Sequence, residues 1–412
     1  MRFQSAILLC VFVGLNAWAQ GGPGRGAPPV KSPEVSTDGR VTFRLRAPGA
    51  SQVAVVGIGQ RLAMQKDDQG VWSATTDPLK PDIYTYSFNV DGATLNDPRN
   101  PLFKSSYGSA GQSLVYVLGS GASVWAPAEG PRGTVAHHFY KSEIIGDNRD
   151  FYVYTPPGYD AKRKEPYPVL FLLHGLGDDA AAWTNVGAAN VILDNLINRG
   201  AAKPMVMVNT LGYGTSDGPA GAMGAGMIPT FMRALIEEVL PQVERTYHVS
   251  QDRMQRAIAG LSMGGAESLY VGLHNTDRFA YIGSFSGAFV MWPRASSPSA
   301  NSPSANSPSA SSPSGGARGG RGPQTMQDAD FDKNFPDLTA KSASRVRLVW
   351  IACGLDDGLN TVNRQFKTWL KSKDIQFTDI EVPGYAHVSP LWRENLAALA
   401  PLLFQSGGKS EK

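Results

Sequence analysis

Cysteine is scarce in this chain, with two residues in 412, Cys10 and Cys353. Because Cys10 lies in an N-terminal apolar run that we expect to be removed, the remaining chain cannot form an intrachain disulfide. Charged residues make up only 18% of the chain and the net charge is +3. No basic stripe with interleaved aromatic residues is present, so nucleic acid is not an expected partner. The sequence has no His, Cys and Asp cluster at metal-ligand spacing and no Gly-rich dinucleotide fingerprint. We therefore expect neither a metal site nor a cofactor.

Long apolar runs are also missing, except for one short stretch at the N-terminus. Arg2 is followed by an apolar run over residues 6–15 and then by the tripeptide AWA at residues 17–19. A short apolar run before an A-x-A site is typical of a secretory signal peptide, so we predict that residues 1–19 are removed on export to the periplasm or the medium. The run is too short to span a bilayer comfortably, and we expect no membrane span after its removal. The Gly- and Pro-rich residues 20–32 predict a disordered leader.

Between residues 33 and 118 the sequence consists of short β runs separated by turn residues. The clearest runs, rich in β-branched and aromatic residues, are VTFRLRAP, QVAVVGI, GVWSATT and IYTYSFNVDG. Their regular spacing indicates a small β-sandwich, and the stretches resemble the immunoglobulin-like early-set modules that precede glycan-active enzymes. Trp72 is either an exposed ring that stacks on sugar or part of the core, and we favour core packing. A glycan-binding role for the module stays open.

After a Gly-, Ala- and Pro-rich linker over residues 119–134, strands and helices alternate. The run PVLFLLHG is continuously apolar, as in a strand buried on both faces. Further strands are expected at FYVYTPPGYD, PMVMVNTL, YIGSFSG, RLVWIACG and FTDIEVPG. The alternation from residue 135 to 405 predicts a mostly parallel sheet with helices on both faces, which is the α/β-hydrolase layout. The Ser-, Pro- and Gly-rich repeats of residues 295–323 predict a disordered insertion, and residues 406–412 form a tail.

The strongest chemical signal is the stretch RAIAGLSMGGAESL, residues 256–269. An apolar strand ends in GLSMG, with Ser262 at its centre, and a helix-like segment follows. Strand, sharp turn and helix is the context in which a G-x-S-x-G motif forms a nucleophile elbow. A side chain at Gly260 or Gly264 would collide with the neighbouring strand or helix. We therefore predict that Ser262 is the nucleophile and that the Met263 N–H, at a helix N-terminus, donates to an oxyanion.

A serine nucleophile needs a histidine base and an acid that orients the base. In this fold the acid and then the histidine follow the serine along the chain. Only His387 lies well downstream of Ser262, on a loop between the last strand-like run and the terminal helix. The strand RLVWIACG is followed by Leu-Asp-Asp-Gly, so Asp356 and Asp357 compete for the role of the acid. The other carboxylate is free to cap the following helix.

The second oxyanion donor is expected on the loop after PVLFLLHG. There the Leu176 N–H would pair with that of Met263, and His174 is interpreted as a structural residue of the loop. Three aromatic residues lie on loops expected around the pocket, where they could stack on an aromatic acyl group or serve only in packing. They are weak substrate-binding candidates: Trp183, Phe289 and Trp292.

Five stretches carry a wider resemblance: LFLLHGLGDDAAAW, NVILDNLI, RAIAGLSMGGAESLYVGLHNTDRFAYIGSFSG, IACGLDDGL and the loop around His387. Together, over residues 135–405, they resemble the feruloyl and acetylxylan esterases of carbohydrate esterase family 1. In that family the acid is the aspartate of a C-G-x-x-D stretch, which here selects Asp357. The family's base commonly follows a Gly-Gly pair, whereas Tyr385 and Ala386 precede His387, so the acyl pocket is expected to differ. The resemblance implies hydrolysis of feruloyl or acetyl esters on xylan or its oligosaccharides.

We therefore predict an exported, two-domain serine carboxylesterase that uses Ser262, His387 and Asp357 to form and hydrolyse an acyl-enzyme. Related folds also hydrolyse siderophore esters or transfer acyl groups, and these activities are the nearest alternatives. A glycan-binding protein with an inactive hydrolase domain is the alternative outside enzymes. The intact Ser, His and Asp argue against that alternative. The oligomeric state does not follow from the sequence.

Overall fold

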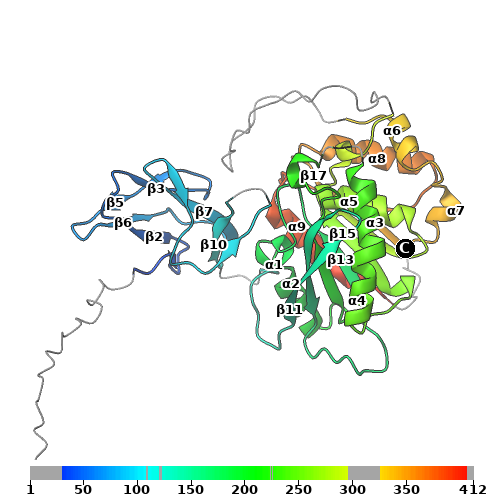
Figure 1. Cartoon of the computed structure of the whole chain (residues 1–412), viewed down its shortest axis with the longest axis horizontal. Helices are drawn as coiled ribbons and strands as arrows, with labels where there is room; N and C mark the ends of the chain where they lie inside the picture. The colour runs from blue at the N-terminus through cyan, green and yellow to red at the C-terminus, as the bar shows by residue number, and fades with distance from the viewer. Residues whose placement is uncertain are drawn as a thin grey trace, which may run out of the picture.

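The computed structural model describes residues 30–107, 110–119, 123–222, 224, 226–295 and 325–405. Figure 1 shows a small all-β part, coloured blue to cyan, beside a larger part in which helices surround a central sheet. The described residues do not include the predicted signal peptide, most of the predicted leader and insertion, or the C-terminal tail. No helix in the described ranges is long and apolar enough to cross a membrane.

The small part, residues 34–117, consists of two antiparallel sheets, and we call it the N-terminal sandwich. In the described residues one sheet has the strand order β1-β2-β6-β5, and the other has β4-β3-β7-β10-β9 with β8 paired to β7. The strands are β1 (Glu34–Val35), β2 (Val41–Arg46), β3 (Val53–Val56), β4 (Leu62–Ala63), β5 (Gln65–Lys66), β6 (Val71–Thr75), β7 (Asp82–Val90), β8 (Ala93–Leu95), β9 (Phe103–Lys104) and β10 (Gln112–Val117).

The N-terminal sandwich has an apolar core of its own. Phe43 of β2 packs on Tyr86 of β7 with ring centroids 4.6 Å apart. Trp72 of β6 lies in the same core with 7% of its surface exposed, and its indole N–H donates to the Ala47 carbonyl at 2.9 Å. Core packing is therefore the correct interpretation of Trp72, which does not offer an exposed ring to sugar.

The larger part, which we call the hydrolase domain, is built on one sheet with the order β11-β12-β14-β13-β15-β16-β17-β18. β12 runs antiparallel to β11 and β14, and all later neighbours are parallel. This is the predicted α/β-hydrolase fold. β11 is not among the predicted strands. The bounds are β11 (Thr134–Ser142), β12 (Asp147–Thr155), β13 (Val169–Leu173), β14 (Val206–Thr210), β15 (Arg256–Leu261), β16 (Tyr281–Phe285), β17 (Leu348–Gly354) and β18 (Thr378–Val382).

Helices cover both faces of this sheet (Figure 1), with α3, α4, α5 and α8 packed on one face and α1, α2 and α9 on the other. A π-helical segment, η2 (Leu235–Val239), joins α3 to α4. The helices are α1 (Ala182–Asn185), α2 (Ala189–Asn198), α3 (Met227–Ala234), α4 (Leu240–Thr246), α5 (Met263–His274), α6 (Asp328–Asn334), α7 (Ala340–Ala343), α8 (Asn360–Ser372) and α9 (Ser389–Leu399). Short 3-10 turns are η1 (Gly218–Ala220), η3 (Arg253–Gln255), η4 (Phe289–Met291) and η5 (Ala400–Leu402).

Strand β13 explains why the central strands read as unbroken apolar runs. Val169, Phe171 and Leu173 join the apolar cluster under α3, α5 and α8. Leu170 and Leu172 join the cluster under α2 and α9. Successive side chains of a strand point to opposite faces, so a strand covered on both faces needs apolar residues at every position.

The N-terminal sandwich shares an apolar core with the hydrolase domain. Ile83 of β7 and Leu114 of β10 belong to the cluster that lies under α2 and α9. The buried Arg393 guanidinium of α9 forms an ion pair with Asp82 of the sandwich and lies 5.4 Å from the centre of the Trp125 ring. A buried charge pair and continuous apolar packing fix the two parts to each other.

Candidate active site

Ser262 sits at a strained turn between β15 and α5. Its φ and ψ are 53° and −114°, a backbone conformation that residues other than glycine rarely adopt. Neighbouring main chain holds it there: its N–H donates to the Phe285 carbonyl and its carbonyl accepts from Ala288, both at 2.8 Å. The hydroxyl is therefore presented at the carboxyl end of β15 on a turn held by main-chain hydrogen bonds, which is the geometry of a nucleophile elbow.

The glycines of the elbow are needed for close approach, as predicted. A Cβ added at Gly264 would lie 2.5 Å from the Leu173 carbonyl oxygen. One added at Gly260 would lie 2.5 Å from the Gly264 carbonyl oxygen. Both contacts are to backbone, which has no free rotation to move aside, so the turn tolerates no side chain at either position.

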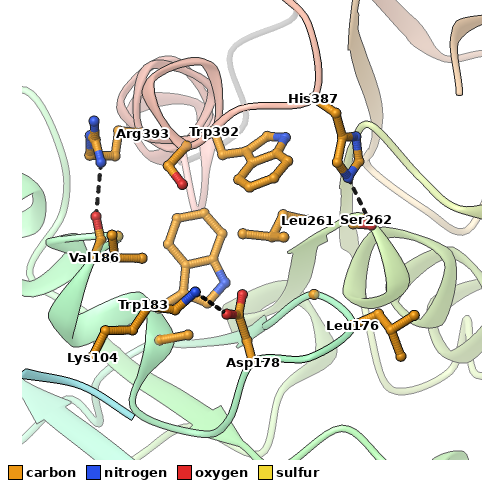
Figure 2. Close-up of a pocket in the computed structure, with 14 residues that line it drawn as sticks. Lys104, Leu176, Asp178, Trp183, Val186, Leu261, Ser262, His387, Trp392 and Arg393 are labelled. Carbon is orange, nitrogen blue, oxygen red and sulfur yellow. Dashed lines mark hydrogen bonds and ion pairs between the residues drawn. The ribbon is translucent and has the colours of Figure 1, made fainter. Parts of the chain in front are cut away.

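His387 meets Ser262 from the loop between β18 and α9. Its Nε2 lies 3.0 Å from the Ser262 Oγ, within hydrogen-bond distance (Figure 2). The edge of its ring packs against Trp392 of α9, with centroids 4.9 Å apart and planes at 79°. The side chain of His387 is 36% exposed, so its base nitrogen is accessible from the pocket.

The two neighbouring aspartates after β17 have different environments. The Asp357 Oδ2 lies 2.9 Å from His387 Nδ1, and its Oδ1 accepts from the Leu359 N–H at 2.8 Å. Its side chain has no exposed area, whereas Asp356 is exposed. The structure therefore brings Asp357, and not Asp356, to the histidine.

Burial alone would raise the pKa of the Asp357 carboxyl. The hydrogen bond and charge of His387, together with the Leu359 N–H and Ser286, outweigh burial and lower that pKa below its usual value. The carboxyl is thus ionised at neutral pH, as required of a group that accepts a hydrogen bond from Nδ1–H and leaves Nε2 free to act as a base.

The predicted oxyanion donors lie on the two segments that flank Ser262. The Gly264 N–H donates to the His174 carbonyl at 3.0 Å, which ties α5 to the loop carrying Leu176. Within the described residues, neither the Leu176 N–H nor the Met263 N–H donates to a protein acceptor. Both groups are therefore available to a ligand oxygen.

His174 is buried and orders this loop. Its Nδ1 lies 2.8 Å from the Gly175 carbonyl, and its Nε2 accepts the Gly212 N–H at 2.9 Å. This pattern assigns the proton to Nδ1. Burial lowers the pKa of His174, so the ring stays neutral. A structural role agrees with the interpretation from sequence.

A pocket of about 210 Å³ opens beside Ser262 and His387 (Figure 2). Trp183 lines it, although its ring is almost fully buried and its indole N–H donates to the Leu173 carbonyl at 2.8 Å. Leu176 also lines the pocket and is 48% exposed.

The prediction that Phe289 and Trp292 lie around the pocket is wrong. Both are buried in the core, where their rings stack on each other with centroids 4.6 Å apart. Each also packs on Phe366 of α8. Neither lines the pocket, because both rings are packed against α8.

The lining residues that were not predicted include four with a charge or an indole ring: Lys104, Asp178, Trp392 and Arg393. Trp392 and Arg393 lie on the first two turns of the helix that follows His387, so their proximity to the base is a signal that sequence offered. Asp178 lies next to the predicted oxyanion loop. No sequence signal could have indicated Lys104, which belongs to the other domain.

No group of His, Cys, Asp and Glu able to hold a metal ion is found among the described residues. Cys353 is a free, buried thiol whose pKa is raised to about 12, chiefly by burial. It therefore carries no thiolate at neutral pH, and the groups arranged for nucleophilic chemistry are Ser262, His387 and Asp357.

The sheet order, the elbow and the meeting of serine, histidine and aspartate define an α/β-hydrolase. The chain belongs to the putative esterase family, whose model matches residues 142–398, well over half of the chain.

Two curated relatives share part of this sequence. An endo-1,4-beta-xylanase/feruloyl esterase of Xylanibacter ruminicola is 28% identical over 382 residues, which cover 90% of this chain and 46% of the relative. An iron(III) enterobactin esterase of Escherichia coli is 27% identical over 203 residues, which cover 48% of this chain and 47% of the relative. The chain thus spans about half the length of the curated relatives that it matches.

Solved structures share the fold. A carbohydrate esterase family 1 ferulic acid esterase from Anaeromyces mucronatus superposes with a TM-score of 0.52 at 22% identity, covering 69% of this chain and 96% of that one. The enterobactin esterase from Shigella flexneri superposes with a TM-score of 0.58 at 20% identity, covering 89% and 93%. Together, the family model and the shared fold confirm the resemblance to esterases that was inferred from the sequence.

Proposed function

We propose that this protein is an exported serine carboxylic-ester hydrolase that removes feruloyl or acetyl groups from xylan or its oligosaccharides. The observation that carries the proposal is the chain of contacts from Ser262 through His387 to the buried Asp357 carboxylate, at 3.0 and 2.9 Å. No metal or organic cofactor enters the proposed reaction. Export is inferred from the signal-peptide pattern of residues 1–19.

In the proposed mechanism, His387 Nε2 takes the Ser262 hydroxyl proton while Oγ attacks the ester carbonyl carbon. The carbonyl oxygen becomes an oxyanion and is held by the N–H groups of Met263 and Leu176. Collapse of the tetrahedral intermediate breaks the ester bond, and protonated His387 gives its proton to the leaving alcohol. Water then attacks the acyl-enzyme with the same histidine as base, which releases the carboxylic acid and restores Ser262.

The substrate class rests on two features. The relative from Xylanibacter ruminicola is named as a xylanase and feruloyl esterase and is similar over most of this chain. The pocket beside Ser262 is lined by the part-exposed Trp392, with the buried Trp183 behind its wall, and an indole ring suits an aromatic acyl group. The pocket of about 210 Å³ is larger than an acetyl group needs, so we favour feruloyl esters over acetyl esters as substrates.

The test is release of ferulate and acetate from feruloylated and acetylated xylo-oligosaccharides, with Ser262→Ala measured alongside. We expect ferulate release by the parent enzyme and a loss of about 10⁶-fold in kcat in the variant. Acetate release alone would retain the mechanism and reassign the acyl group. Equal ester hydrolysis by the parent and by Ser262→Ala would refute the proposed nucleophile, whereas a parent without activity on any ester would favour a glycan-binding role.

A second candidate is hydrolysis of siderophore esters. The iron(III) enterobactin esterase of Escherichia coli is similar in sequence over 48% of this chain. The fold likeness to enterobactin esterase extends over 89% of this chain. A panel with iron(III) enterobactin beside feruloylated oligosaccharides separates the two, since the higher kcat/KM identifies the substrate class. Acyl transfer to an added sugar in preference to water would indicate an acyltransferase.

A further inference from the structure

The N-terminal sandwich reaches the active-site pocket through one short segment, residues 103–107. Lys104, the last residue of β9, lines the pocket, and its ammonium lies 2.7 Å from the Asp178 carboxylate. The two side chains are 20% and 15% exposed, so the pair is largely shielded from water and restrains geometry more than an exposed pair would. Figure 2 shows this pair within the pocket that Ser262 and His387 also line.

Tyr107 makes the second contact of this segment. Its ring packs on Tyr213 of the hydrolase domain with centroids 5.2 Å apart. It also lies directly against Gly218, where an added Cβ would come within 2.0 Å of a Tyr107 ring carbon. Segment 103–107 is therefore in close contact with the loops of the hydrolase domain at two points.

Tyr213 in turn holds the loop of residues 175–178, which we call the oxyanion loop. The Tyr213 hydroxyl accepts the Gly177 N–H at 2.7 Å and donates to the Asp178 carbonyl at 3.1 Å. Tyr213 is fully buried, and the Arg149 guanidinium donates to its carbonyl at 2.5 Å. The main chain of the oxyanion loop is thus held by Tyr213, and its Asp178 side chain is held by Lys104.

Leu176 lies inside the loop that these contacts restrain. Its side chain is 48% exposed and contributes little packing. Gly177, with φ at 85°, follows it, and Gly175 precedes it close to Ser262. Glycine-flanked backbone is intrinsically flexible, whereas an oxyanion donor loses its effect when it is displaced by about 1 Å. Precise placement of the Leu176 N–H therefore depends on the contacts around the loop.

We propose that Lys104 is a positioning residue for the oxyanion loop and that the N-terminal sandwich is thereby part of the catalytic unit. Lys104 acts through Asp178 and does not touch the reacting atoms. The proposal rests on the esterase function proposed above. It differs from a glycan-binding role for the sandwich, in which only substrates that carry sugar would be affected.

The test compares full-length Lys104→Met with the parent on 4-nitrophenyl acetate, an ester without sugar. Methionine keeps an unbranched side chain and removes the charge. We expect kcat to fall about tenfold while KM changes less than about twofold, because the loss falls on the transition state and not on ground-state binding. Lys104→Arg should recover most of the loss, since a guanidinium can also pair with Asp178.

Tyr116→Phe is the matched control from the same domain interface. The Tyr116 hydroxyl donates to the Asn185 carbonyl at 3.3 Å, so this variant also loses a polar contact between the two domains, but away from the oxyanion loop. We expect its kcat to equal that of the parent. An equal loss in Tyr116→Phe and Lys104→Met would overturn the proposal, because it would show a general effect of loosening the interface.

A second measurement tests the oxyanion loop directly. The rate at which a 4-nitrophenyl alkylphosphonate forms its tetrahedral adduct on Ser262 should fall in Lys104→Met in parallel with kcat. In a cycle with Asp178→Asn, the double variant should be no slower than the slower single variant, because both changes remove the same pair. Additive losses would contradict action through Asp178.

The remaining outcomes separate the two proposals. If the parent hydrolyses esters, Ser262→Ala does not, and Lys104→Met keeps the parent kcat, then only the positioning role fails. A defect of Lys104→Met that is confined to KM on glycosylated esters would overturn the positioning role in favour of a sugar contact. If the parent hydrolyses none of the ester substrates, the proposed function is refuted, and the positioning role with it.

Discussion

On one side of the active-site pocket, Ser262, Asp357 and His387 all come from the hydrolase domain, on segments that follow the parallel strands β15, β17 and β18. They meet through two direct side-chain contacts of 3.0 and 2.9 Å. On the other side, the oxyanion loop is held by a buried tyrosine and by Lys104 of the N-terminal sandwich. The first side is fixed by sheet topology. The second side depends on contacts between the two domains. Substitutions should therefore affect one side of the pocket without affecting the other.

After the loss of the nucleophile itself in Ser262→Ala, the largest effect is expected on the first side, from Asp357→Asn. An amide in place of the carboxylate favours the wrong histidine tautomer, so kcat should fall about 10⁴-fold. The control is Asp356→Asn, which makes the same chemical change at the exposed neighbouring aspartate. This variant should retain the parent kcat within about twofold. Steady-state rates on 4-nitrophenyl acetate decide the matter, and a larger loss in the Asp356 variant would reverse the assignment of the acid.

The sequence alone indicated the first side well. A G-x-S-x-G between an apolar strand and a helix determines Ser262, because few backbones other than a nucleophile elbow need glycine on both flanks of a serine. The order of residues in the fold selects His387. The choice between Asp356 and Asp357 could not be made from the residues themselves, since both follow the same strand, and it depended on family resemblance until burial distinguished them.

The second side could not be predicted, for a physical reason. Lys104 is one ordinary lysine in a short β run, and its role follows from how two domains pack together, which no local pattern records. The error over Phe289 and Trp292 has a related origin. An aromatic residue on a loop after a strand can point into a pocket or back into the core, and periodicity does not distinguish these orientations over so few residues.

Glu267 lies between the two sides and gives a stability test. It is on α5, fully buried, and neither carboxylate oxygen has a partner among the described residues. A Cβ at Gly212, near Tyr213, would lie 2.9 Å from its Oε2. Burial raises the pKa of Glu267 well above its usual value. Between the two pKa values the folded chain keeps a proton that the unfolded chain releases. The contribution of Glu267 to the free energy of unfolding is therefore fully present below about pH 4.5 and is lost as pH rises toward the raised pKa.

We therefore expect the free energy of unfolding of the parent, relative to Glu267→Gln, to decrease between pH 5 and pH 8. The limiting slope is about 1.4 kcal/mol per pH unit, the value for one proton. Urea titrations of both proteins at several pH values measure the difference. Glu237→Gln makes the same change at an exposed carboxylate, and an equal slope there would rule out burial as the cause. A difference that grows with rising pH would mean that Glu267 is ionised in the fold.

On the oxyanion side, Tyr213→Phe should lower kcat on 4-nitrophenyl acetate by about tenfold, a smaller loss than that from Asp357→Asn. The change removes the hydroxyl that accepts the Gly177 N–H and holds the Asp178 carbonyl. Tyr167→Phe is the matched control, since it also removes a buried tyrosine hydroxyl that accepts a main-chain N–H, that of Asp160. Tyr167 precedes β13, at the end of the strand opposite the pocket, and its variant should keep the parent kcat. Equal losses would show that both act through general stability.

The smallest expected effect concerns the strain stored at the elbow, and it is measured with inactive variants. Ser262→Gly and Ser262→Ala both remove the hydroxyl, but only alanine keeps a Cβ at φ 53°. The glycine variant should therefore be the more stable of the two by about 1 kcal/mol in urea unfolding. Ser284 lies within strand β16, where the backbone is extended, so the opposite order is expected. Ser284→Gly should be less stable than Ser284→Ala by about 0.5–1 kcal/mol. The same sign at both positions would mean that the Ser262 turn relaxes freely, and that the first side of the pocket is not held by its backbone.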